Sequence, residues 1–221
     1  MADGSAVSAS LIACFDASAF SAQPYRHWLL SDILPVALCD GIDALPVRPP
    51  KIEDTEGRRE THNSSRLFFG LDNRRRHPVC DALAAGFQSA ATVERIERLC
   101  AIELSGKSNL RIEYCLDTDG FWLEPHTDIG AKLFTMLVYL SSEPGSEEWG
   151  TDILDAHLNL VAVTPYKRNC GLIFVPGSDT WHGFHKRPIS GVRPLIVNYV
   201  KPEWRSRHEL AYPDRAAGAA S

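Results

Sequence analysis

The stretch Leu133-Phe-Thr-Met-Leu-Val-Tyr-Leu140 decides the fold, because it is apolar on both of its faces. Such a run is typical of a strand buried in the middle of a sheet. The earlier stretch Leu110–Leu116 alternates instead, so that its apolar residues share one face. Further short strands are predicted at 151–154, 158–163, 171–175 and 192–200. Many short strands separated by proline- and glycine-containing turns predict a sandwich or barrel.

The first half of the chain predicts helices. Residues 25–34 carry apolar side chains at helical spacing before Pro35, and a longer helix, with a break along it, is predicted from Pro78 to about Ala101. A loop is expected from about 45 to 63, and frayed ends at 1–10 and 213–221. We therefore expect an α+β, mainly β fold in one domain of 221 residues. In it, 1–105 form a mostly helical support and loop region, 106–202 the catalytic core and 203–221 a C-terminal tail.

The composition excludes several classes of function. A net charge of −5 argues against nucleic-acid or anionic-membrane partners. No apolar run approaches the roughly 20 residues that span a bilayer. The first residues lack the basic region of a secretory signal. The six cysteines form no CxxC pair, so neither a structural zinc site nor a disulfide framework is expected, and a reduced cytoplasmic location is predicted.

The chemistry is concentrated in His126-Thr127-Asp128, His182 and Arg193. Two imidazoles and one carboxylate can hold one face of an iron(II) octahedron and leave the opposite positions open. An arginine supplies a two-pronged clamp for a carboxylate. The HxD pair alone is weak in a chain with eight histidines, since His126 could equally be a surface turn residue after Pro125.

Side-chain parity supports the set, because alternate residues of a strand share a face. His126 and Asp128 have the same parity, so both can point at one metal ion. Thr135, Leu137 and Tyr139 share a face, and so do the odd-numbered residues from Arg193 to Tyr199. We expect the hydroxyl groups of the first strand to point inward beside Arg193.

On these residues the chain resembles the iron(II)/2-oxoglutarate-dependent dioxygenase superfamily, over roughly 110–199. The similarity includes the HxD segment, a T-x-L-x-Y-L strand typical of the prolyl hydroxylase-like branch, and the segments around Trp149-Gly-Thr151 and Trp181-His-Gly183. The arginine stands in an H-x10-R pattern, and the distance of this basic residue varies between branches, so the subfamily stays open.

The resemblance implies a double-stranded β-helix, a jelly-roll or cupin-like core, with iron(II) and 2-oxoglutarate as cofactor and co-substrate and O2 as oxidant. It implies that His126, Asp128 and His182 ligate iron. The 2-oxoglutarate contacts that it implies are Arg193 and Tyr139 on the distal carboxylate, Thr135 nearby and Tyr114 lining the pocket.

Three alternatives bear on these assignments. His185 is close to His182, but only His182 gives the spacing to Arg193 that the resemblance implies, so His185 is expected at the rim. Arg187 falls in a turn and is expected to be a solvated charge, as is the run Arg74–Arg76. Halogenating relatives carry a small residue in place of the carboxylate, and the presence of Asp128 disfavours that chemistry.

The implied activity is hydroxylation of a C–H bond, coupled to decarboxylation of 2-oxoglutarate to succinate and CO2. A small-molecule substrate is favoured because the chain leaves little length for a protein-docking domain. The alternatives are a peptide or protein hydroxylase, and a non-enzymatic cupin-like protein that binds or senses metal. The sequence leaves the oligomeric state open.

Overall fold

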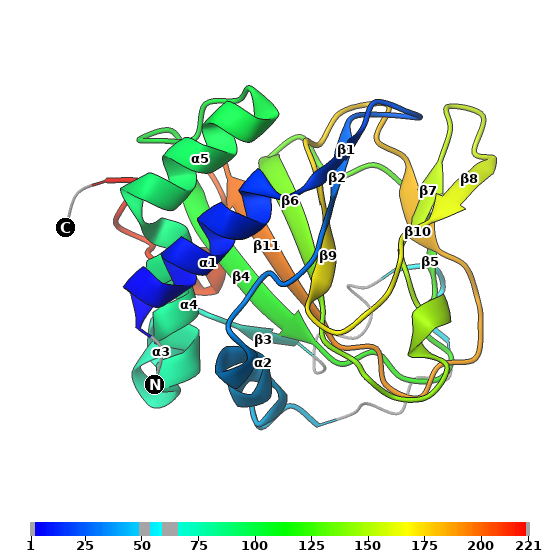
Figure 1. Ribbon diagram of the computed structural model, residues 1–221, viewed down its shortest axis with the longest axis horizontal. Helices are drawn as coiled ribbons and strands as arrows, with labels where there is room; N and C mark the ends of the chain where they lie inside the picture. The colour runs from blue at the N-terminus through cyan, green and yellow to red at the C-terminus, as the bar shows by residue number, and fades with distance from the viewer. Residues whose placement is uncertain (1–2, 49–53, 59–65, 220–221) are drawn as a thin grey trace.

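The computed structural model describes residues 3–48, 54–58 and 66–219, and its main feature is a pair of β-sheets (Figure 1). The larger sheet has the strand order β1-β2-β9-β6-β11-β4-β3, and the smaller one the order β5-β10-β7-β8. Every pairing within the two sheets is antiparallel. The strands are β1 (Ala19–Ser21), β2 (His27–Leu30), β3 (Arg66–Phe68), β4 (Asn109–Cys115), β5 (Leu123–His126), β6 (Lys132–Tyr139), β7 (Asp152–Leu154), β8 (Leu160–Val163), β9 (Cys170–Phe174), β10 (His182–Phe184) and β11 (Pro194–Val200).

Helices cover the face of the large sheet that lies away from the small sheet, as Figure 1 shows for α1, α4 and α5. The helices are α1 (Gly4–Asp16), α2 (Val36–Asp43), α3 (Leu71–Arg76), α4 (Pro78–Gln88) and α5 (Ala90–Cys100), with 3-10 turns at Ser146–Glu148 and Arg207–Glu209. Asp3 starts α1 by accepting the backbone N–H groups of Ser5 and Ala6. None of the helices in the described ranges has the length and apolarity needed to cross a membrane.

The centre of the large sheet separates an apolar side from a polar one. On β6, Phe134, Met136 and Val138 are buried in the main hydrophobic cluster with the helices. The cluster takes odd-numbered residues from β11 and even-numbered residues from β4: Leu195, Val197 and Tyr199, with Leu110, Ile112 and Tyr114. Because side chains alternate, the remaining residues of these strands face the small sheet.

The predicted elements are largely confirmed. The chain is built mainly of antiparallel sheets with some helices, and all six predicted strands are present. The long predicted helix is broken at Ser89, whose hydroxyl accepts the N–H of Thr92 and so caps α5. The six cysteines, all of which lie in the described ranges, form no disulfide with one another. The loop predicted at 45–63 has neither helix nor strand at 45–48 and 54–58, and the rest of it lies outside the described residues.

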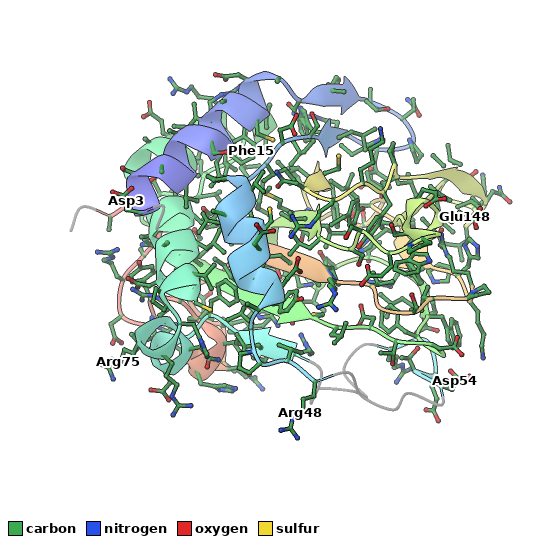
Figure 2. All side chains as sticks on the ribbon, turned by 60° about the horizontal axis from the view of Figure 1, so that its bottom comes forward. Asp3, Phe15, Arg48, Asp54, Arg75 and Glu148 are labelled. Carbon is green, nitrogen blue, oxygen red and sulfur yellow. The ribbon has the colours of Figure 1, made fainter. Side chains whose placement is uncertain are left out.

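Four predictions of local structure are wrong. Within 25–34 the chain forms the strand β2, which pairs with β1 and β9, rather than a helix. The N-terminal segment is helical from Gly4 rather than frayed. In the C-terminal segment, the N–H of Ala217 donates to the carbonyl of Ser108, so the described part of 213–219 is attached to the protein. The run Arg74–Arg76 lies in the last turn of α3, and Arg75 projects from the edge of the molecule as predicted (Figure 2). The Arg74 side chain, however, is only 13% exposed and donates to Asp81, so for this residue the prediction of a solvated charge is wrong.

Candidate functional site

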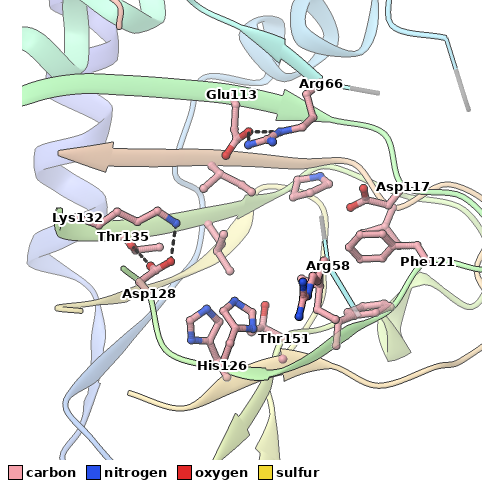
Figure 3. Close-up of a pocket in the computed structure, with 18 of the residues that line it drawn as sticks. Arg58, Arg66, Glu113, Asp117, Phe121, His126, Asp128, Lys132, Thr135 and Thr151 are labelled. Carbon is pink, nitrogen blue, oxygen red and sulfur yellow. Dashed lines mark hydrogen bonds and ion pairs between the residues drawn. The ribbon is translucent and has the colours of Figure 1, made fainter. Parts of the chain in front are cut away.

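A cavity of about 530 Å³ lies between the two sheets. The large sheet contributes residues of β4, β6 and β11 to its wall. The small sheet contributes residues of β5 and β10 and Thr151, which directly precedes β7 (Figure 3). The residues on which the argument depends are His126, Asp128, Lys132, Thr135, Tyr139 and His182. A cavity of this volume is within the range of small-molecule sites.

Two predicted ligands, His126 and His182, meet in this cavity. They are directly opposite each other in the pairing of β5 with β10, and their ring centroids are 4.4 Å apart. Nδ1 of His126 lies 2.7 Å from the carbonyl oxygen of Glu124, and Nδ1 of His182 lies 3.0 Å from that of Thr180. A carbonyl can only accept, so Nδ1 carries the proton in both rings. In the neutral form of each ring the lone pair is then on Nε2, the nitrogen that a metal ion would bind.

Burial keeps His182 uncharged. Removal from water, with a further contribution from the neighbouring His126, lowers the pKa of His182 to about 4. The ring also contacts the aromatic ring of Phe174, with centroids 4.7 Å apart. A neutral imidazole at neutral pH is the form that ligates metal ions.

The third predicted ligand, Asp128, lies in the same cavity but is bonded to other residues. Its side chain is 5% exposed, and the two carboxylate oxygens accept from the Lys132 ammonium at 2.5 Å and the Thr135 hydroxyl at 2.6 Å (Figure 3). Burial alone would raise the pKa of Asp128, but the charge of Lys132 and the hydrogen bonds from Lys132 and Thr135 hold it below its usual value. Within the described ranges, no three His, Cys, Asp or Glu side chains are placed to hold a metal ion together.

Behind Asp128 a buried polar network crosses the large sheet, and apart from Thr135 its members are residues that sequence reasoning missed. The Thr135 hydroxyl accepts from the amide of Asn198 at 2.9 Å, and Asn198 accepts from Arg111 at 3.1 Å. Arg111 also donates to Glu113 at 2.8 Å and to Glu209 at 2.6 Å. The signal was the alternation of β4, where charged Arg111 and Glu113 separate apolar residues. That charged side looks like a solvent face but lines the cavity.

The predicted inward direction of Arg193 and Tyr114 is wrong. Pro194 of β11 is opposite Tyr139, so the odd-numbered residues of β11 face the helices while those of β6 face the cavity. Arg193 instead donates to the hydroxyl of Tyr114 at 3.3 Å and lies 3.5 Å from Glu143. Tyr114 is opposite Leu195 and is buried on the helix side.

Tyr139 and Thr135 do line the cavity, as predicted. The Tyr139 hydroxyl forms hydrogen bonds with the hydroxyls of Thr151 at 2.8 Å and Thr164 at 2.7 Å. Burial raises the pKa of Tyr139, so the phenol is neutral. This end of the cavity therefore offers hydroxyl groups as hydrogen-bond partners.

His185 and Arg187 lie outside this cavity. Nδ1 of His185 is 2.9 Å from a carboxylate oxygen of Asp152, and Arg187 donates to the other oxygen at 2.5 Å. The Arg187 side chain is only 10% exposed and stacks over Phe184, so the prediction of a solvated charge is wrong. His185 lines a separate apolar groove on the far side of the small sheet rather than the rim of the cavity.

Comparison with known proteins gives a likeness of fold. No protein-family model matches the chain. No curated protein matches it either. Among solved structures, it is similar to a prolyl-4-hydroxylase from Pseudomonas putida, with 15% identity and a TM-score of 0.55 over 88% of this chain and 94% of the other.

Two further neighbours have similar values. A prolyl hydroxylase from Trichoplax adhaerens, in complex with a hypoxia inducible factor oxygen degradation domain peptide fragment, has 13% identity and a TM-score of 0.56, over 92% and 93% of the two chains. The viral collagen prolyl hydroxylase of Paramecium Bursaria Chlorella virus-1, in a 2OG complex, has 17% identity and a TM-score of 0.51, over 79% and 95%. At these identities the comparison concerns the fold alone.

Proposed function

We propose that this protein is an Fe(II)- and 2-oxoglutarate-dependent oxygenase that hydroxylates a C–H bond. The observation that carries the proposal is the pair His126 and His182, which face each other across β5 and β10 with both Nδ1 atoms held by backbone carbonyls. The likeness to prolyl hydroxylase structures supports it. In this proposal the two antiparallel sheets form the double-stranded β-helix, or jelly roll, of that class.

The chain's own residues fit an iron(II) site in their donor chemistry. His126 and His182 would supply imidazole nitrogens, and Asp128 a carboxylate oxygen, which is the facial set that leaves open positions. Thr135 orients Asp128 by donating to it, and Asn198 in turn fixes Thr135. When bound, iron(II) and 2-oxoglutarate supply the oxidation of a C–H bond by O2, with succinate and CO2 as co-products.

The 2-oxoglutarate assignment rests on the fold likeness and on the cavity rather than on Arg193. Tyr139 lines the cavity and remains our candidate for the distal carboxylate, with Thr135 bonded to the proposed ligand Asp128. We do not propose Arg193 and Tyr114 as co-substrate contacts, because they lie on the helix side of the large sheet. The cationic residues that line the cavity within the described ranges are Arg58, Arg66, Arg111 and Lys132.

A small molecule is the substrate class that we favour, because a cavity of about 530 Å³ between two sheets suits a compact ligand. A peptide hydroxylase is the second candidate. It is favoured by the neighbour from Trichoplax adhaerens, which was solved with a peptide fragment. An assay for succinate formation with both kinds of candidate substrate separates the two.

The first experiment is an anaerobic titration with iron(II) and then 2-oxoglutarate, followed by visible absorption. We expect a metal-to-ligand charge-transfer band in the wild-type protein and none in His182→Ala. The matched control is His157→Ala, which changes an exposed histidine on the turn before β8. A wild-type protein that binds iron(II) without forming the band would refute the 2-oxoglutarate assignment.

A further inference from the structure

Lys132 is the residue whose position the proposed function leaves unexplained. Its ammonium bonds to Asp128, four positions earlier, across the turn between β5 and β6. The lysine side chain is 20% exposed and lines the cavity. An oxygen that a metal ion would use is therefore occupied by a cation, and the three ligands do not converge in this state.

The two groups that hold Asp128 are not equally free to move. Thr135 is β-branched, is buried in β6, and is fixed by the amide of Asn198 at 2.9 Å. Lys132 has a flexible four-carbon stem and three donors that can be reoriented. A divalent ion and an ammonium group on the same carboxylate repel each other. Lys132 is therefore the partner that Asp128 loses when a metal ion binds.

A displaced ammonium in this cavity needs a new anion, because a charge with low exposure is costly without a partner. Among the described residues, the three glutamates that line the same cavity are already paired: Glu113 accepts from Arg66 at 2.6 Å and from Arg111, and Glu209 also accepts from Arg111. The third, Glu124, lies 3.8 Å from Arg58. The anion must then come with a ligand. Resting on the proposed function, we infer that Lys132 holds Asp128 in the metal-free protein and binds a ligand carboxylate in the metal-loaded protein.

The carboxylate could belong to 2-oxoglutarate or to the substrate, and the length of β6 distinguishes between the two. Lys132 and Tyr139 are the two ends of β6, seven residues and thus roughly 23 Å apart along the strand. A five-carbon dicarboxylate cannot reach both ends. If Tyr139 binds the distal carboxylate of 2-oxoglutarate, Lys132 is left for the substrate that is to be hydroxylated. That substrate would have to contain a carboxylate group.

The test is pulse acetylation of the wild-type protein with N-acetoxysuccinimide, with the modification of Lys132 measured by peptide mass spectrometry. Lys107 is the internal standard, because it is also paired with an acid four residues away, Glu103, but lies on the surface. We expect Mn(II) to raise the rate at Lys132 several-fold and to leave Lys107 unchanged. Mn(II) binding is measured separately by calorimetry. An unchanged or slower rate at Lys132 with Mn(II) bound would overturn the inference alone, whereas a wild-type protein that binds no metal overturns the proposed function as well.

Three additions identify the carboxylate: pyruvate, 2-oxoglutarate, and pyruvate with acetate. Pyruvate can chelate the metal but has no second carboxylate. Protection of Lys132 by 2-oxoglutarate alone assigns the site to the co-substrate. Protection by acetate in the presence of pyruvate assigns it to a separate substrate. Protection by none of the three overturns the carboxylate site.

The variant Lys132→Met gives an independent measurement, with Lys107→Met as the matched control. Removing the competing ammonium should tighten Mn(II) binding several-fold and weaken the binding of the protecting carboxylate to the Mn(II)-loaded protein. Weaker Mn(II) binding would instead make Lys132 a purely structural support of Asp128 and overturn the inference.

Discussion

The substitution Arg193→Met tests whether the Arg193 side chain lies on the helix side of the large sheet or in the cavity, where it would bind the co-substrate. The backbone of Arg193 is held on both sides: its N–H donates to the Ser141 hydroxyl at 2.9 Å, and its carbonyl accepts from Leu140 at 3.1 Å. The side chain reaches the Tyr114 hydroxyl on the helix side. Bringing it into the cavity would require a one-residue slip of β11, which would also turn the buried Leu195 and Val197 outward.

The two placements predict very different magnitudes. A buried arginine that donates two hydrogen bonds to a carboxylate contributes about 1.5–3 kcal/mol for each, so its loss would weaken 2-oxoglutarate binding by roughly 100-fold or more. In the structure, the Arg193 side chain is 30% exposed and its contacts with Glu143 and Tyr114 are 3.5 Å and 3.3 Å long. Contacts of this kind contribute about 1 kcal/mol or less to folding. We therefore expect the affinity of Arg193→Met for 2-oxoglutarate to differ from that of the wild-type protein by less than about threefold. A tenfold change would correspond to about 1.4 kcal/mol.

The assay is the anaerobic iron(II) and 2-oxoglutarate titration, with urea unfolding of the same samples. Tyr139→Phe is the comparison variant, since Tyr139 lines the cavity and Arg193 does not, and it should weaken co-substrate binding more than Arg193→Met does. A loss of 30-fold or more in Arg193→Met, with an unchanged unfolding midpoint, would refute the face assignment and restore Arg193 as the clamp.

Three further predictions concern residues that line the cavity between the two sheets. Thr135→Val removes the hydroxyl that orients Asp128 at nearly constant volume and should weaken Mn(II) binding about tenfold by calorimetry, as loss of a ligand's supporting hydrogen bond does; an unchanged affinity would contradict the role of Thr135. Arg111→Met removes the arginine that bonds Glu209 and leaves Glu113 with Arg66 alone, and it should lower the free energy of unfolding in urea by about 3–5 kcal/mol, whereas a loss below about 1 kcal/mol would count against the network. In the metal-free protein, His182 has a pKa of about 4 against an ordinary 6.5, so the stability from its neutral form is complete above pH 6.5 and is lost as the pH falls toward 4. Between pH 6.5 and 4, the urea midpoint should fall less steeply with decreasing pH in His182→Phe than in the wild-type protein. Equal slopes would refute the lowered pKa of His182.

The sequence predicted strands well where a run was long or alternated clearly, as for β4, β6 and β11. It failed at β2, where His27–Leu30 is one short apolar run before a proline. Such a run fits a buried strand as well as a helix turn, and only its pairing with β9 decides between them. The same limit applies to β1 and β3, which are three residues long and depend on their neighbours for stability.

Parity failed between strands although it held within each one. Residues 135, 137 and 139 do share a face, and so do 195, 197 and 199, with Arg193 reaching Tyr114 on that same side. Whether those two faces coincide depends on the register between β6 and β11, which is set by the loops that join them and by burial. Here Ile196 is opposite Leu137, so the two odd-numbered sets lie on opposite faces of the sheet. A pattern in one strand cannot contain that information.

The same distinction explains why strand pairing fixes the directions of the two imidazoles but not the direction of the Asp128 carboxylate. His126 is the last residue of β5 and is opposite His182, so its direction is fixed by two paired strands. Asp128 lies beyond the end of β5, in the turn before β6, where alternation no longer sets the direction of a side chain. Its carboxylate is positioned by Lys132 and Thr135 instead. Asp128, which would complete the proposed metal site, is thus held partly by a lysine that can be displaced. The same carboxylate could then bind Lys132 in the metal-free protein and a metal ion in the loaded one.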